Sequence, residues 1–152
     1  TKSTVSPQEK LQKSLNQLIE KEDLKLATQI TEKGVSIILP GGIFFESGKA
    51  DLQPNAYLIL EKLVGNLKDA PFDISIEGHT DNVPIRSNLY PSNWELSSAR
   101  ASQVVRFLIE KGIPSQRLKA VGLADTHPVA PNTDPENQAK NRRVLIIIHS
   151  GV

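Results

Sequence analysis

The chain has 152 residues and a formal net charge of +1, with 38% hydrophobic and 23% charged residues. This balance is typical of one globular domain, and the near-neutral charge favours neither nucleic acid nor an anionic membrane surface as a partner. There is no cysteine, which excludes disulfides and thiolate metal sites. There is no methionine either, so we interpret the chain as a processed product or an excised fragment. No apolar run approaches the ~18 residues that span a bilayer, and we expect any membrane anchor outside this sequence.

The first expected element is a helix from Pro7 to about Lys21, because leucine and isoleucine recur there at helical spacing. Its apolar stripe is narrow, so the helix can pack on a partner as readily as on the core of its own chain. We therefore divide the chain into an N-terminal spacer helix, residues 1–22, and a globular domain, residues 23–152.

A β-hairpin is expected next, with strands at 24–31 and 34–39 and Gly34 supplying a positive φ at the turn. A helix beginning at Pro54 follows. Its predicted apolar face consists of Ala56, Leu60, Leu63, Val64 and Leu67. Residues 72–78 alternate between apolar and polar side chains, which predicts a strand with one buried face.

In the second half, Ser92 and Glu95 have the spacing of a capping box that opens a helix, and Gly112 ends it. The buried face predicted for this helix is Ala101, Val104, Val105, Leu108 and Ile109. Strands are expected at 118–124 and, in a central position, at 144–148. Between them we expect a Pro/Asn/Asp-rich loop at 125–141 that contains one helical turn at most. The order of elements predicts an α/β (α+β) sandwich, with two main helices on a mixed β-sheet and an additional N-terminal helix.

Short polar side chains gather beyond the 72–78 strand, where layered α/β folds often place their sites. Asp81 is an acceptor that suits an ammonium group, and Arg100 is a planar fork that suits a carboxylate. Together they fit the zwitterionic end of an α-amino acid. In the alternative, which spacing alone favours, Asp81 caps a turn and bonds Arg100 itself. Arg142 and Arg143 enter the last strand on opposite faces, so at most one of them faces a given pocket.

Other chemistries find less support. His79 and Asp81 are spaced like two metal ligands, but nothing positions the third or fourth ligand of a metal site. The sequence has no Gly-x-Ser-x-Gly elbow and no suitable carboxylate pair, so we expect neither an enzyme nor a cofactor. Trp94 is expected to pack partly buried at a helix start, with a stacking platform for sugar as the alternative.

Three blocks in order resemble the signature of OmpA-like peptidoglycan-binding domains: Gly78-His79-Thr80-Asp81, Asn93-x-x-Leu96-Ser97-x-x-Arg100-Ala101 and Asn141-Arg142-Arg143-Val144. The resemblance covers roughly residues 43–148 and implies an OmpA-like fold. It also implies non-covalent binding of the peptidoglycan stem peptide, with Asp81 and Arg100 gripping the amine and α-carboxylate of diaminopimelate. The further pocket positions that it implies are Phe45, Ser47, Thr80, Asn93, Leu96, Arg142 and Arg143.

Within that family the chain is most similar to the periplasmic domains of MotB-type flagellar stator proteins. The segment Asn82-Val83-Pro84-Ile85 follows the first block directly, and a long stretch leads to Asn93. This similarity implies anchoring of a stator to the cell wall, a homodimer, and a MotA-like partner in the inner membrane. It also implies an extracytoplasmic location, with the membrane segment outside this chain. Because some secretion-system subunits share the Pro-Ser-Asn-Trp-Glu-Leu-Ser block, a wall anchor of a secretion system or an outer-membrane lipoprotein is the alternative.

Overall fold

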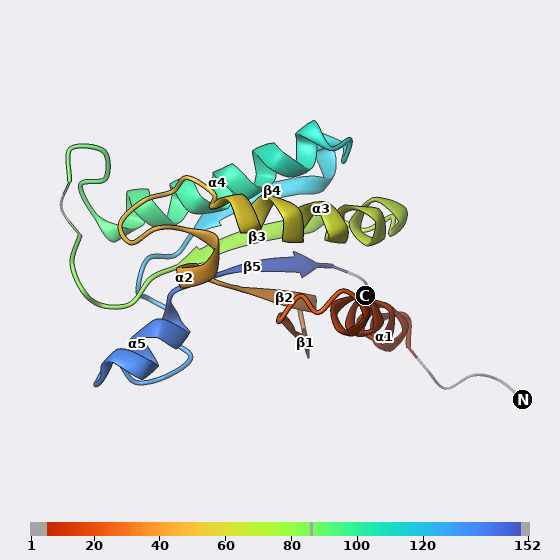
Figure 1. The fold of residues 1–152 in the computed structure, drawn as a ribbon, viewed down its shortest axis with the longest axis horizontal. Coiled ribbons are helices and arrows are strands. Elements are labelled where there is room, and N and C mark those ends of the chain that lie inside the picture. Colours follow the sequence, from red (N-terminus) through yellow and green to blue (C-terminus); the bar gives the residue numbers. More distant parts are fainter. Residues whose placement is uncertain (1–5, 86, 150–152) are drawn as a thin grey trace, which may run out of the picture.

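The computed structural model of the chain describes residues 6–85 and 87–149. Five strands form one sheet with the spatial order β1-β2-β5-β3-β4 (Figure 1). The strands are β1 (Ala27–Thr31), β2 (Gly34–Pro40), β3 (Ile74–His79), β4 (Leu118–Gly122) and β5 (Arg143–Ile148). The helices are α1 (Pro7–Lys21), α2 (Gly41–Phe44), α3 (Pro54–Asp69), α4 (Asn93–Glu110) and α5 (Pro135–Asn141). The predicted fold class is therefore confirmed.

Strand β5 lies at the centre of the sheet, antiparallel to both β2 and β3, while β4 runs parallel to β3. Ile146 of β5 is opposite Ile37 of β2 and Ile76 of β3, and all three side chains are fully buried. The apolar faces of α1, α3 and α4 pack with this side of the sheet into one core. Burying one aliphatic side chain of this kind stabilises the folded state by about 1.5–3 kcal/mol relative to leaving it exposed.

Helix α3 buries the five residues predicted for its apolar face. In α4 the prediction is partly wrong, because Ile109 is 42% exposed and Phe107 is buried in its place. The Phe107 ring packs against Tyr57 of α3, with ring centroids 5.6 Å apart. The buried face of α4 is therefore turned toward α3, a neighbour that the pattern within α4 alone does not reveal.

The helix termini follow the predicted signals with one difference. Ser92 is the N-cap of α4 and accepts a hydrogen bond from the Trp94 N–H, but the Glu95 carboxylate accepts from the Ser92 hydroxyl, so the predicted capping box is incomplete. A complete capping box opens α1 instead, between Ser6 and Glu9. Gly112 ends α4 with a φ of 101° and the paired hydrogen bonds of a Schellman motif.

The expectation that β3 has a single buried face is wrong, since all six of its residues are buried. The alternation marks the two faces correctly, but polar contacts enclose the second face as well. Ser75 bonds the His149 ring at 2.7 Å, and Glu77 bonds Lys33 and His79 at 3.2 Å each. A central strand can thus carry polar residues on a buried face when each has a partner.

Helix α1 packs on the core of its own chain, against β1, β2 and α3. Leu15 is fully buried and Ile19 is 9% exposed. Thr28 of β1 donates a hydrogen bond to Asn16 at 2.7 Å and so ties the helix to the edge strand. The division of the chain at residue 22 stays a prediction, but the contacts of α1 are those of a core element.

Candidate ligand-binding site

A cavity of about 670 Å³ opens at the end of the sheet where β3 ends and β5 begins. Helix α2, the loop after β3, the start of α4 and helix α5 supply its lining residues. Figure 1 shows α2 and α5 near the left end of the sheet. Eight of the nine predicted site residues line this cavity: Phe45, Ser47, Thr80, Asp81, Asn93, Leu96, Arg100 and Arg142. Segments far apart in the sequence therefore bring the three predicted blocks to one place.

Arg143 is the exception. Its side chain is 6% exposed, and its guanidinium donates to the Asn141 and His127 carbonyls, each at 3.0 Å. Arg142 lines the cavity, while Arg143 starts β5 and does not. The expectation that only one of the two arginines faces a given pocket is confirmed.

Asp81 has both carboxylate oxygens engaged. Its Oδ1 accepts a hydrogen bond from the Val83 N–H at 3.0 Å, which closes a turn, and its Oδ2 accepts from Nη1 of Arg142 at 2.5 Å. The structural alternative considered for Asp81 is thus half right. Asp81 does cap a turn, but its ion-pair partner is Arg142 and not Arg100.

Arg100 is a buried cation held by neutral groups. Its side chain projects from α4, with the whole residue 5% exposed, and donates from Nε to the Lys49 carbonyl at 2.8 Å and from Nη2 to the Glu46 carbonyl at 3.1 Å. The guanidinium carbon lies 4.9 Å from the centre of the Phe45 ring. Among the described residues no carboxylate lies within 4 Å of it, and Nη1 has no hydrogen-bond partner.

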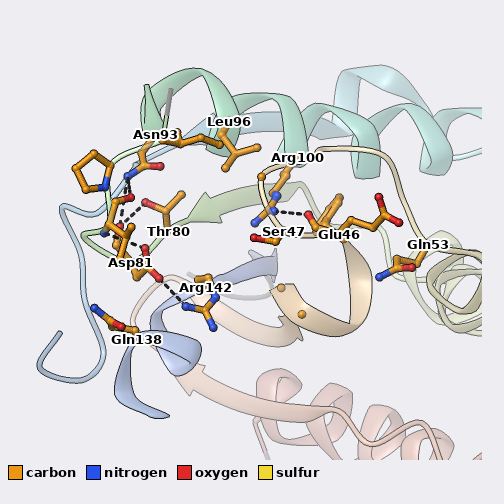
Figure 2. A pocket seen from close by; sticks show the side chains of 17 residues that line it. Glu46, Ser47, Gln53, Thr80, Asp81, Asn93, Leu96, Arg100, Gln138 and Arg142 are labelled. Carbon is orange, nitrogen blue, oxygen red and sulfur yellow. Dashed lines mark hydrogen bonds and ion pairs between the residues drawn. The ribbon is translucent and has the colours of Figure 1, made fainter. Parts of the chain in front are cut away.

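Burial, and after it the nearby positive charge of Arg142, lower the pKa of the Arg100 guanidinium to about 10. The group remains protonated at neutral pH. Figure 2 shows Asp81 and Arg142 on one side of the cavity and Arg100, beside Ser47 and Glu46, on the other. The site thus offers a paired carboxylate and a separate cation that lacks an anionic partner.

Three other predicted residues shape the walls of the cavity. Asn93 donates from Nδ2 to the Val83 carbonyl at 3.0 Å, and so ties the loop after β3 to the start of α4. Thr80 donates to the Asp81 carbonyl at 2.9 Å. Leu96, 4% exposed, supplies an apolar surface. In this structure Asn93 and Thr80 position the backbone around Asp81.

Two glycines allow the close approaches that assemble the site. A Cβ on Gly78 would lie 2.1 Å from the Ser97 carbonyl oxygen, so only glycine lets α4 pack down on the end of β3. A Cβ on Gly41 would lie 2.9 Å from the Arg142 carbonyl oxygen, which accepts the Gly41 N–H at 2.8 Å. Both contacts fix the distance between the segments that carry the charged residues.

The cavity also contains residues that the sequence reasoning did not assign to the site. These include Gly41, Gly42, Glu46, Gln53, Pro84, Ile85 and Gln138. Pro84 and Ile85 directly follow the first block in the sequence, and this position could have been used to assign them to the site. Gln138 lies in α5, within a Pro/Asn/Asp-rich stretch whose sequence pattern gives no sign of a pocket.

Trp94 is 50% exposed at the start of α4 and is not part of the cavity wall. Within residues 6–85 and 87–149, no group of three His, Asp or Glu side chains could hold a metal ion. No helix in the same ranges is long and apolar enough to cross a membrane.

The segment that forms the cavity matches a known protein family. Residues 44–142, which include most of the cavity wall, match the model of the OmpA family. The chain belongs to the OmpA family.

Among curated proteins, the chain is 41% identical to YtxE of Bacillus subtilis over 97% of its length, and 39% identical to motility protein B (MotB) of B. subtilis over 82%. It is 34% identical to the peptidoglycan-binding protein ArfA of Mycobacterium tuberculosis over 78%. It spans 62%, 48% and 35% of these relatives, respectively.

Two solved structures share the fold closely. A MotB-like protein from Desulfovibrio vulgaris superposes with a TM-score of 0.88 at 28% identity, covering 95% of this chain and 92% of that one. The cell wall anchor of the type VI secretion system (T6SS) of Pseudomonas aeruginosa superposes with a TM-score of 0.82 at 30% identity, covering 90% and 97%. The resemblance to MotB periplasmic domains is therefore confirmed, and the fold is shared with a secretion-system protein.

Proposed function

We propose that the chain binds the stem peptide of peptidoglycan non-covalently, in the cavity between Asp81 and Arg100. The observation that carries this proposal is the state of Arg100. It is a buried cation beside an open cavity, without a carboxylate within 4 Å among the described residues. Burying an unpaired charge costs several kcal/mol. A carboxylate supplied by a ligand would neutralise the guanidinium and accept hydrogen bonds from its free donors.

The stem peptide has the matching chemistry when its third residue is diaminopimelate. The free end of that residue carries an ammonium and a carboxylate, which suit Asp81 and Arg100. Each charge-assisted hydrogen bond is worth about 1.5–3 kcal/mol. Two such contacts with some packing correspond to micromolar to millimolar binding.

The names of the relatives support the cell wall as the ligand. ArfA is named a peptidoglycan-binding protein, and the P. aeruginosa structure is that of a cell wall anchor. Two of the relatives cited above carry functional names, motility protein B and a peptidoglycan-binding protein, and neither name is that of an enzyme. We therefore propose a binding domain without catalytic activity.

The likeness to MotB supports a role in motility. We propose that the chain anchors a flagellar stator to the wall from an extracytoplasmic position, as a homodimer. Its MotA-like partner would lie in the inner membrane, reached through a segment outside this sequence. Dimerisation suits the task because two weak sites on one wall raise the overall affinity without any new contact.

Anchoring of a secretion system is the second candidate, and it rests on the close match to the P. aeruginosa wall anchor. Genetic complementation separates the two roles. The full-length protein should restore swimming to a cell that lacks its stator B subunit. Restored type VI secretion without restored swimming would favour the second role.

The wall-binding proposal is tested by sedimentation with purified, insoluble peptidoglycan sacculi. The intact chain should sediment, and the Asp81→Ala and Arg100→Ala variants should remain soluble while still folded. Asp125→Ala and Arg106→Ala are matched controls, because both side chains are exposed and neither lines the cavity. Arg106 lies on the same helix as Arg100. If the folded intact chain stays in the supernatant, wall binding is refuted.

A further inference from the structure

The acceptor assigned to a ligand ammonium is already occupied in the free protein. Oδ2 of Asp81 accepts a hydrogen bond from Arg142 at 2.5 Å, and Oδ1 accepts one from the Val83 N–H. The Asp81 side chain is only 9% exposed. An ammonium group that enters the cavity therefore meets a carboxylate whose charge is already neutralised.

The fixed charges of the cavity do not balance. Two guanidinium groups, those of Arg100 and Arg142, face one carboxylate, that of Asp81. Glu46 also lines the cavity, but its carboxylate is paired with Lys49 at 2.9 Å and both side chains are more than half exposed. The ion pair between Asp81 and Arg142 thus leaves the charge of Arg100 in excess.

Arg142 combines a fixed backbone with a movable side chain. Its carbonyl accepts the Gly41 N–H at 2.8 Å, and its own N–H donates to the Gln138 carbonyl at 3.2 Å. Its side chain is 40% exposed, and Asp81 is its one hydrogen-bond partner among the described residues. The guanidinium can therefore leave Asp81 by rotation about its own side-chain bonds, without a change in the fold.

We propose that Arg142 is an exchangeable counter-ion that selects ligands carrying both an ammonium and a carboxylate. In the free protein it neutralises Asp81. When the ligand of the proposed function binds, on which this inference rests, Asp81 passes to the ligand ammonium and Arg142 turns to a ligand carboxylate. Asp81 and Arg142 then each keep a partner through the exchange.

The same exchange works against simple cations. An ammonium group without a carboxylate would displace Arg142 from Asp81 and leave two guanidinium groups in the cavity without an anion. Leaving a charge partly buried and unpaired is costly, so such a ligand gains little from Asp81. Arg142 thus acts as a repulsive element against lysine side chains and amines.

The test compares two probes on the Arg142→Gln variant. Nα-acetyl-lysine amide carries an ammonium and no carboxylate, and meso-diaminopimelate carries both. Binding is followed through the NMR signal of the Val83 amide, which donates to Asp81. The wild type should respond to diaminopimelate and bind the lysine amide very weakly. The variant should bind the lysine amide roughly 10- to 100-fold more tightly than the wild type does, the value of one charge-assisted hydrogen bond.

Two controls separate this exchange from a general effect of charge. Lys140→Gln removes a positive charge from the exposed surface of α5, outside the cavity wall, and should give much less gain in lysine amide binding. The double variant Asp81→Asn, Arg142→Gln should lose the gain. An Arg142→Gln variant that is folded but binds the lysine amide no better than the wild type overturns the inference, and so does an equal gain in Lys140→Gln.

The two proposals fail in different ways. Sedimentation with sacculi tests whether the chain binds the cell wall. The lysine amide experiment tests only whether Arg142 competes with an ammonium group for Asp81. If the wild type ignores sacculi and Arg142→Gln still gains lysine amide binding, wall binding fails and the counter-ion at Asp81 stands. If sacculi bind and the variant shows no gain, only the counter-ion role fails.

Discussion

Replacing Arg100 by lysine keeps the positive charge in the cavity and removes the planar fork. In the structure that fork holds the Lys49 and Glu46 carbonyls at 2.8 and 3.1 Å, and stacks over Phe45. A lysine ammonium is a compact charge that cannot reach two carbonyls and present two parallel donors to a carboxylate at once. The substitution therefore weakens the loop around residues 46–49 as well as the carboxylate contact.

The loss of stability and the loss of ligand affinity can be estimated separately from the contacts of Arg100. Arg100→Lys should lose about one hydrogen bond to a charged group within the fold, worth about 1.5–3 kcal/mol of unfolding free energy. Loss of the bidentate contact should weaken ligand binding by a similar amount, or roughly 10- to 100-fold. Urea unfolding measures the first effect, and sedimentation with sacculi at increasing concentration measures the second.

Arg106→Lys on the exposed side of α4 is the matched control, and it should change neither quantity. If Arg100→Lys binds the wall as tightly as the wild type, the bidentate contact is wrong and Arg100 acts at most as a point charge. If it loses stability without losing wall binding, the role of Arg100 is confined to holding the loop.

Three further predictions concern stability. Leu15→Ala should cost about 2–5 kcal/mol in urea unfolding because Leu15 is fully buried, and a loss below about 1 kcal/mol would show that α1 is dispensable to the core. Arg117→Ala should cost about 2–4 kcal/mol, since its guanidinium bonds four carbonyls at and beyond the end of α3, yet sacculus binding by the folded protein should not change. The His79 hydrogen bond is the main cause that lowers the pKa of Glu77 to about 2, and burial lowers the pKa of His79. Both groups bind protons more readily when unfolded, so stability should fall as the pH drops below about 6.5 through His79 and from about 4.5 to 2 through Glu77. Glu77→Gln should flatten the second part of that curve, and an unchanged acid limb would contradict this assignment.

The buried residues of a helix or strand are predicted best when the sequence pattern of that element alone determines them. The apolar face of α3 is correct residue by residue, because its period follows from the helix alone. The face of α4 is partly wrong because Phe107 packs on Tyr57, a contact made by a different helix. The second buried face of β3 was missed for the same reason, since His149 and Lys33, which enclose it, are distant in sequence.

In the cavity, too, the residue types were predicted from the sequence, but a contact between distant segments was not. The residue types suited to a zwitterion were predicted at Asp81 and Arg100, and the structure places both in the cavity wall. The partner of Asp81 was not predicted, because Arg100 and Arg142 are equally plausible from residue type. Only the arrangement of the strands distinguishes them.

Strand register decides that pairing. In the antiparallel pair of β3 and β5, Gly78 is opposite Val144 and His79 is opposite Arg143. The same register, continued past the strand end, sets Thr80 opposite Arg142, so Asp81 and Arg142 become diagonal neighbours at the mouth of the cavity. A shift of one residue would exchange Arg142 for Arg143 at this position and turn every side chain of β5 to the other face of the sheet. The register of β3 and β5 thus determines which arginine neutralises Asp81, and with it the charge that a ligand must displace.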